Sequence, residues 1–217
     1  MTQSVSQVSI LGTGKMGTAV GRKLAEAGVQ VIFGSRSPSE TAEKYADLAN
    51  VSVVDYAHAC AASEHVVIAV PWAHTLDLVR EHQGALASKV ILDMTNPTSP
   101  DWSFLVTSGD NSAAEEITKA SNSPRVVKVF NGITADNFPQ PDFSGEAAQA
   151  MYCGNDDEAK ADVRSLIEQC GYVPVDCGSL ENARYLESLA MLWVQLAFWE
   201  DWDSEFSFKI IGKSPAL

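Results

Sequence analysis

The chain has 217 residues, of which 46% are hydrophobic and 20% charged, a balance typical of a globular protein with a buried core. Its net charge of −13 argues against binding to nucleic acid or to an anionic membrane surface, which would repel it. The four cysteines show neither C-x-x-C nor zinc-ligand spacing, and no basic leader precedes the first apolar run. We therefore expect reduced thiols, no metal site, no membrane partner and a cytoplasmic location.

Apolar runs and amphipathic segments alternate through the first part of the chain. The pattern predicts strands over residues 8–11, 29–33, 51–54, 65–70, 89–94 and 126–130. It predicts helices over residues 15–27, 40–49, 58–62 and 74–83. Such alternation is typical of a parallel sheet with helices on both faces.

Residues 96–124 interrupt this pattern with turn and loop compositions, followed by a short predicted helix over 112–120. A long polar loop beside a ligand site could be a mobile flap or an ordinary surface excursion. The sequence leaves both interpretations open.

The character of the chain changes after residue 137. We predict a strand over 149–153, a helix over 156–170, a strand over 172–175 and a long helix over 181–199. The long helix is apolar on most sides, so we expect it to be buried between two parts of this chain or against a second chain. These patterns predict a Rossmann-type α/β fold. A doubly wound, mostly parallel sheet would occupy residues 1–137, and a small C-terminal α+β or helical domain residues 138–217.

A glycine motif joins the first predicted strand to the first predicted helix. Gly12 permits the tight turn, Gly14 lets a pyrophosphate approach the backbone, and Gly17 lets the helix pack close to the strand. The helix N-terminus then presents free N–H groups to the phosphates. The cofactor-binding residues predicted here are Gly12, Thr13, Gly14, Lys15, Met16 and Gly17.

Ser35 and Arg36 stand where NAD-binding proteins carry an acidic residue that holds the ribose. A carboxylate there would repel the 2′-phosphate of NADP, whereas a hydroxyl and a guanidinium can both bind it. The motif therefore predicts NADP as the cofactor.

The predicted strand ends supply candidates for the reacting end of the site. Val70, Pro71 and His74 follow one strand, and Asn96 and Asn131 follow the next two. We predict that Val70, Pro71, His74 and Asn96 contact the cofactor. His74, Asn96 and Asn131 are the candidates for catalysis, against plainer roles in helix packing and turn formation.

Several segments in order resemble the family of deazaflavin (coenzyme F420)-dependent NADP oxidoreductases. They are ILGTGKMG, FGSR, VIAVPWAH, ILDMTNP, VVKVFN, the tail GYVPVDCGSLENARYLESLAMLW and EFSFKIIG. The same motifs are similar to the cytosolic reductase domain of six-transmembrane metalloreductases, in which the acceptor is a flavin. The resemblance implies a homodimer that binds NADPH through residues 12–17, Ser35 and Arg36. It also implies an acceptor with an anionic tail, for which Lys15, Lys128 and Lys209 are the candidate cations.

We therefore expect an NADPH-dependent oxidoreductase that transfers a hydride between NADP(H) and a deazaflavin or flavin-like acceptor. Two alternatives remain at this stage. One is an imine or carbonyl reductase, which would need His74 or Asn131 to donate a proton or polarise a double bond. The other is a non-catalytic module that senses NADP(H). Family members often carry a basic residue just after the arginine, whereas this chain has Pro38 and Glu40, so we expect a modest preference for NADP.

Overall fold

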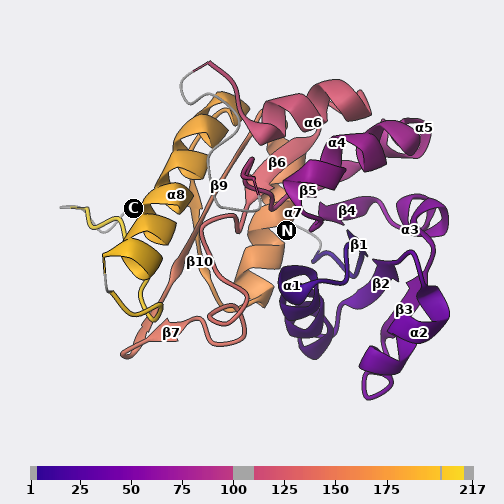
Figure 1. Ribbon diagram of the computed structural model, residues 1–217, viewed down its shortest axis with the longest axis horizontal. Coiled ribbons are helices and arrows are strands. Elements are labelled where there is room, and N and C mark those ends of the chain that lie inside the picture. Colours follow the sequence, from indigo (N-terminus) through magenta and orange to yellow (C-terminus); the bar gives the residue numbers. More distant parts are fainter. Residues whose placement is uncertain (1–3, 100–109, 201, 213–217) are drawn as a thin grey trace.

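The computed structural model describes residues 4–99, 110–200 and 202–212, and its centre is an eight-stranded sheet (Figure 1). The order across the sheet is β10-β9-β6-β5-β4-β1-β2-β3. The strands are β1 (Gln7–Leu11), β2 (Gln30–Gly34), β3 (Val51–Val54), β4 (His65–Ile68), β5 (Val90–Asp93), β6 (Val126–Val129), β9 (Gln149–Gly154) and β10 (Val173–Asp176). All neighbouring strands are parallel except β6 and β9. The predicted Rossmann-type, mostly parallel sheet is confirmed.

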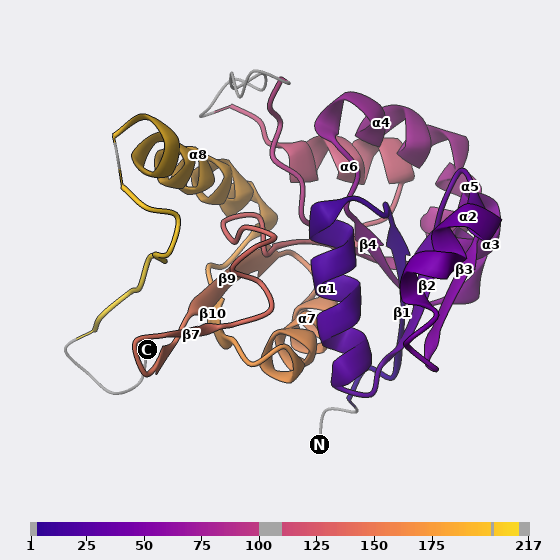
Figure 2. The same ribbon diagram turned by 60° about the horizontal axis from the view of Figure 1, so that its bottom comes forward.

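Helices cover both faces of this sheet. They are α1 (Lys15–Glu26), α2 (Pro38–Ala42), α3 (Tyr56–Ala62), α4 (Trp72–Glu81), α5 (Gln83–Leu86), α6 (Ala113–Ser121), α7 (Asp157–Gln169) and α8 (Ala183–Trp199). Figure 2 shows α1 and α7 on one side of the sheet and α4 and α6 on the other. The interior strands β4, β5 and β6 are thus enclosed on both sides and are buried at every residue.

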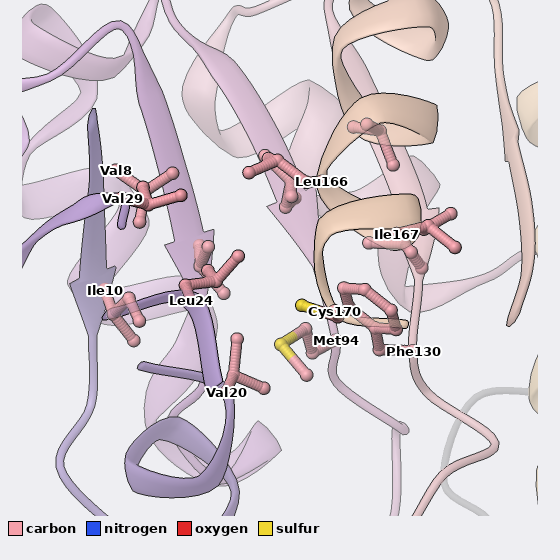
Figure 3. Packing of buried hydrophobic residues seen from close by; sticks show 14 of the residues in the cluster. Val8, Ile10, Val20, Leu24, Val29, Met94, Phe130, Leu166, Ile167 and Cys170 are labelled. Carbon is pink, nitrogen blue, oxygen red and sulfur yellow. The ribbon is translucent and has the colours of Figure 1, made fainter. Parts of the chain in front are cut away.

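Two hydrophobic clusters correspond to the two faces. In the first, Val20 and Leu24 of α1 pack beside Leu166 and Ile167 of α7 (Figure 3). The second joins the opposite face of the sheet to residues of α3, α4, α6 and α8. Both helical layers therefore pack on the same strands, and these strands position the described turns that follow them, after β1, β2, β4 and β6.

Several local predictions differ from the structure. The helix predicted over 40–49 ends at Ala42 and continues as a 3-10 helix, Glu43–Tyr45. The long C-terminal helix is preceded by a 3-10 turn, Leu180–Asn182. The sequence pattern missed α5 and the hairpin β7 (Asp142–Phe143) to β8 (Glu146–Ala147), because these elements are too short to show a periodicity.

The sheet is continuous across residue 137, because β9 pairs antiparallel with β6 and β10 extends the sheet beyond β9. The division into a nucleotide-binding domain of residues 1–137 and a small C-terminal domain of residues 138–217 stays a prediction, and the sheet itself runs across that boundary. Residues 100–109 of the predicted loop lie outside the described residues, and the helix predicted after them is confirmed as α6.

Burial of α8 is confirmed for one face. Leu186, Ala190 and Trp193 are buried, but Tyr185 and Leu192 on the opposite side are 69% and 48% exposed.

In the described part of the chain, the helices are all too short or too polar to span a lipid bilayer.

Candidate dinucleotide and acceptor site

The glycine motif forms a tight turn between β1 and α1. Gly12 has φ of 125°, a conformation that side-chain-bearing residues rarely adopt, and a Cβ there would collide with the carbonyl oxygen of Ala69. A Cβ at Gly17 would collide with the carbonyl oxygen of Gly12. In contrast, the Cβ position of Gly14 is open, with no protein atom within 4 Å. The space above Gly14 and the uncapped start of α1 therefore fit a pyrophosphate.

The other motif residues differ in exposure. Thr13 and Met16 are half-buried, whereas Lys15 is exposed at the first position of α1. No acidic residue lies in the first turn of this helix, so nothing there opposes an anion.

Ser35 and Arg36 have separate structural roles at the end of β2. The Ser35 side chain is buried, and its hydroxyl accepts a hydrogen bond from the Ser37 N–H at 3.1 Å and pairs with the Thr41 hydroxyl at 2.8 Å. It therefore shapes the turn. Arg36 is exposed, so its guanidinium is the group of this pair that is free to reach a phosphate.

Tyr56, which the sequence reasoning missed, lies close to Arg36. Burial raises the pKa of the Tyr56 phenol, and the nearby Arg36 charge counteracts part of that rise. Tyr56 also packs against Gly34, where a Cβ would approach the Tyr56 ring to 2.8 Å. An arginine and an aromatic ring at one strand end are groups that stack on an adenine. Because Tyr56 follows the third strand, only the pairing of β2 with β3 brings it to this place.

Most of the positively charged side chains in the described residues are already paired. Of the described cations, Lys15, Arg36 and Lys44 are those whose side chains have no carboxylate or carbonyl partner. Lys15 lies in the glycine turn and Arg36 at the end of β2. The cations that remain available for an anion therefore include the two at the predicted pyrophosphate and 2′-phosphate positions.

Val70, Pro71 and His74 lie where β4 leads into α4. Val70 packs against the glycine turn, since a Cβ at Gly12 would come within 3.1 Å of its side chain. Pro71 caps α4, and its carbonyl oxygen accepts the His74 N–H. The His74 side chain is exposed, so a ligand can reach it. It takes no part in the hydrogen bonds of Asn96 and Asn131.

Asn96 and Asn131 meet directly. The Asn96 Nδ2 amide donates to the Asn131 carbonyl oxygen at 2.8 Å, and the Asn131 Nδ2 amide donates to Asn96 Oδ1 at 3.0 Å. Asn131 Nδ2 also donates to the carbonyl oxygen of Leu186 in α8 at 3.0 Å. Both amide protons of Asn131 are therefore committed, which leaves its Oδ1 as an acceptor. The expectation that Asn131 could polarise a double bond by donating a hydrogen bond finds no free N–H in this geometry.

Asn131 is held by an unusual backbone conformation at the residue before it. Phe130 has φ of 59°, in the left-handed region. Its ring is buried against Phe138 and Tyr172, with ring centroids 5.0 and 6.1 Å apart. Strained backbone of this kind persists where surrounding packing enforces it, and it is concentrated at functional sites.

A cleft opens beside this turn, between the end of β6, strand β9, helix α8 and the segment near Phe208. The space between these elements, counted together with its solvent-open part, is about 400 Å³. Its lining comprises Phe130, Asn131, Gly132, Ile133, Gln149, Met151, Leu186, Leu189, Ala190, Ser207 and Phe208. None of these lining residues is ionisable. The Gln149 side-chain amide donates to the Ile210 carbonyl oxygen and accepts from the Ile210 N–H, so the Ile210 backbone occupies it. An apolar cleft with a few polar groups suits a planar organic ring.

Three buried ionisable side chains, Asp93, Lys128 and Glu187, contact one another. Lys128 donates to Asp93 Oδ2 at 2.8 Å and lies 2.7 Å from Glu187 Oε1, and all three side chains are at most 1% exposed. Burial alone would lower the pKa of Lys128, but the two carboxylates raise it above its ordinary value. Burial, supported by Asp93, raises the pKa of Glu187 despite the opposing charge of Lys128.

This burial corrects one expectation from the sequence. Lys128 cannot bind an anionic tail, because it is fully buried and already paired with two carboxylates. Lys209 is exposed beside the cleft, but it is paired with Glu146. No local sequence pattern could indicate the pairing of Lys128, because Asp93, Lys128 and Glu187 are far apart along the chain.

Comparison with known proteins gives the same family as the motifs. The family model described as "NADP oxidoreductase coenzyme F420-dependent" matches residues 7–97. An F420-dependent NADP reductase of Methanothermobacter marburgensis is 30% identical over 207 residues, which cover 88% of this chain and 92% of that protein. The metalloreductase STEAP3 of Rattus norvegicus is 31% identical over 185 residues, but the chain spans 36% of its length.

Solved structures support the fold. A protein of Arthrobacter sp. FB24, named as a candidate F420-dependent NADP reductase, superposes with a TM-score of 0.83 and 26% identity, covering 94% of this chain and 99% of that one. An imine reductase of Streptomyces aurantiacus has a TM-score of 0.66 at 17% identity over 88% of this chain and 62% of that one, which shows a shared fold. On these sequence matches, the chain belongs to the family of coenzyme F420-dependent NADP oxidoreductases.

Proposed function

We propose that this protein transfers a hydride between NADP(H) and the planar ring of a deazaflavin or flavin-like acceptor. The observation that carries the proposal is the cleft beside Asn131, which lies at the carboxyl edge of the sheet and has no ionisable residue in its lining. Hydride transfer between two rings requires stacking and orientation and does not require a proton from the protein.

In this proposal, each group of site residues binds a different part of the ligands. The glycine turn binds the pyrophosphate of NADP and Arg36 binds its 2′-phosphate, and NADP supplies the hydride chemistry. Val70 and Pro71 form the side of the site where β4 ends. Asn96 and Asn131 orient the carboxamide end through the Asn131 Oδ1 and the remaining Asn96 N–H. Leu186, Leu189 and Ala190 of α8 form the apolar wall for the acceptor.

Reduction of an imine or carbonyl is the alternative that would need a protein proton donor. Asn131 cannot donate in the observed geometry, because both of its amide protons are bound. His74 would then have to supply the proton. The non-catalytic alternative predicts tight NADPH binding without oxidation by any acceptor.

Oxidation of NADPH can be followed at 340 nm with a panel of acceptors: 5-deazariboflavin, riboflavin, FMN, a quinone, and a cyclic imine. We expect turnover with the ring acceptors and little with the imine. Turnover with the imine alone would refute the proposal in favour of imine reduction. Binding of NADPH without any turnover would support the sensing role.

We also propose that the protein is a homodimer whose interface includes the exposed side of α8. Tyr185, Leu192 and Trp199 are 69%, 48% and 53% exposed and recur every seven residues, so they form one stripe along the helix. Apolar stripes of this kind on soluble proteins are usually covered by a partner.

Light scattering after size exclusion tests the dimer. Leu192→Glu should shift the protein toward a monomer, whereas Val173→Glu, at an apolar site of similar exposure on β10, should not. A monomeric wild type would contradict this part of the proposal. The cytoplasmic location remains a prediction from composition.

A further inference from the structure

Asp93, Lys128 and Glu187 form a buried charge network that the proposed hydride transfer does not itself use. We propose that Glu187, held by Lys128, is a positioning residue that sets the distance between the acceptor wall on α8 and the strand ends that face the nicotinamide. This inference rests on the proposed function, because it assigns an acceptor to the cleft.

Stability alone does not account for such a network. Burying charged groups is costly, and apolar residues of similar volume often replace a buried ion pair without loss of stability. With its groups charged, this network holds two carboxylates and one ammonium, all at most 1% exposed. Both oxygens of Glu187 also accept the Ala113 N–H at the start of α6, at 3.0 and 3.1 Å. A residue bound from two directions has a closely defined position.

The network is one half of a closed circuit of contacts. Asp93 Oδ1 accepts hydrogen bonds from the N–H and the hydroxyl of Thr95, which fixes the turn that carries Asn96. Asn96 is bound to Asn131, and Asn131 donates to the carbonyl oxygen of Leu186. Leu186 precedes Glu187, so the circuit returns to the charge network.

This circuit of contacts links the two sides of the cleft. Asn131 belongs to the strand-end side, and Leu186, Leu189 and Ala190 of α8 belong to the opposite wall. Releasing Glu187 would remove one of the polar contacts that hold this part of the helix, beside the Asn131–Leu186 hydrogen bond and the Arg184–Glu115 ion pair. A displacement of about 1 Å at a hydride-transfer site can lower the rate about a hundredfold.

Glu187→Gln is the sharpest test, because it keeps the size of the side chain and leaves Asp93 paired with Lys128. The Gln Nε2 group would face the Ala113 N–H or the Lys128 ammonium, which are both donors, so the hold on α8 weakens. Asp93→Asn loosens the other end of the same network. Asp162→Asn is the matched control: Asp162 of α7 binds His65, the first residue of β4, at 2.9 Å, and neither residue lines the cleft.

Two measurements are compared across these variants. The first is the single-turnover rate of hydride transfer from NADPH to 5-deazariboflavin, with 4-deuterated NADPH to verify the step. The second is the dissociation constant of 5-deazariboflavin from the NADP+ complex, measured by fluorescence. For Glu187→Gln and Asp93→Asn, we expect the transfer rate to fall about tenfold to a hundredfold and the ring to bind more weakly, with NADP+ affinity nearly unchanged. Asp162→Asn should change only the melting temperature.

The outcomes separate the two proposals. If the wild type binds 5-deazariboflavin but transfers no hydride to it or to riboflavin, the proposed function fails, and ring binding in the variants still decides the role of Glu187. The inference is overturned if Glu187→Gln binds the ring and transfers hydride like the wild type, or if Asp162→Asn lowers both values equally. Absence of ring binding by the wild type overturns both proposals.

Discussion

The hydroxyl of Ser35 lies 2.8 Å from the hydroxyl of Thr41, and both side chains are buried. The Ser35 hydroxyl also accepts the Ser37 N–H, so it stabilises the turn after β2. Arg36 is thereby placed on the surface of that turn. We infer that the selection of NADP depends mainly on the arginine, with the serine acting through the shape of the turn.

Arg36→Ala should raise the Michaelis constant for NADPH about tenfold or more and change that for NADH little, because a charge-assisted hydrogen bond to the 2′-phosphate is lost. Steady-state kinetics with both nucleotides measure this. Arg164→Ala on α7, where Arg164 is exposed and paired with Glu168, serves as the control for loss of one positive charge. Equal effects on NADPH and NADH would show that Arg36 does not bind the 2′-phosphate.

Gly14→Ala and Gly17→Ala should differ in kind. The Cβ position of Gly14 is open, so alanine there should leave the melting temperature nearly unchanged but weaken NADPH binding by occupying space near the pyrophosphate. Alanine at Gly17 would collide with the Gly12 carbonyl, so this variant should lose stability. Calorimetric titration and thermal melts compare the two. Unchanged NADPH affinity in Gly14→Ala would place the pyrophosphate elsewhere.

His74→Gln should leave the turnover number and its pH profile unchanged with a ring acceptor, because the proposed reaction takes no proton from the protein. Loss of an alkaline or acidic limb of the pH profile in His74→Gln would assign a proton transfer to this histidine.

Asn131→Ala should lower the turnover number about tenfold or more, since it removes the hydrogen bonds to Asn96 and Leu186. Pre-steady-state kinetics resolve the transfer step.

Three of the four thiols should be inert in the folded protein. Burial raises the pKa of Cys60, Cys153 and Cys170 to about 12, so their reactive thiolates are scarce at neutral pH. Cys177 is less buried, although its pKa is also raised by burial. Titration with a disulfide reagent should therefore label at most Cys177 before unfolding and all four thiols after it. Rapid labelling of more than one native thiol would contradict this burial.

The stability of the protein should fall with rising pH through the ionisation of Glu187. Because burial raises the folded-state pKa of Glu187 above its unfolded value, the folded state retains a proton that the unfolded state has lost. This contribution is complete below the unfolded pKa and disappears as the pH rises through the folded pKa. Urea titrations across that window should show a flatter profile for Glu187→Gln than for the wild type. Parallel profiles would mean that Glu187 titrates normally.

Much of the molecule was already determined by local sequence. The strand–Gly12-x-Gly14-x-x-Gly17–helix order, the alternation of apolar strands with amphipathic helices, and the Ser35-Arg36 pair are local signals, because hydrophobic period and backbone freedom act over a few residues. They predicted the parallel sheet and its main helices, both confirmed. They also predicted NADP, which the family match supports, and its binding residues, which stay predictions.

Contacts between distant segments were decided only by the tertiary structure. Nothing near Lys128 in the sequence distinguishes a buried, doubly paired lysine from a solvated one at a ligand rim. Likewise, Asn131 could not be known to have its amide protons committed until β5, β6 and α8 were brought together. Hydrogen bonds and charges that lie far apart in sequence meet through strand order and helix packing, which no local periodicity encodes.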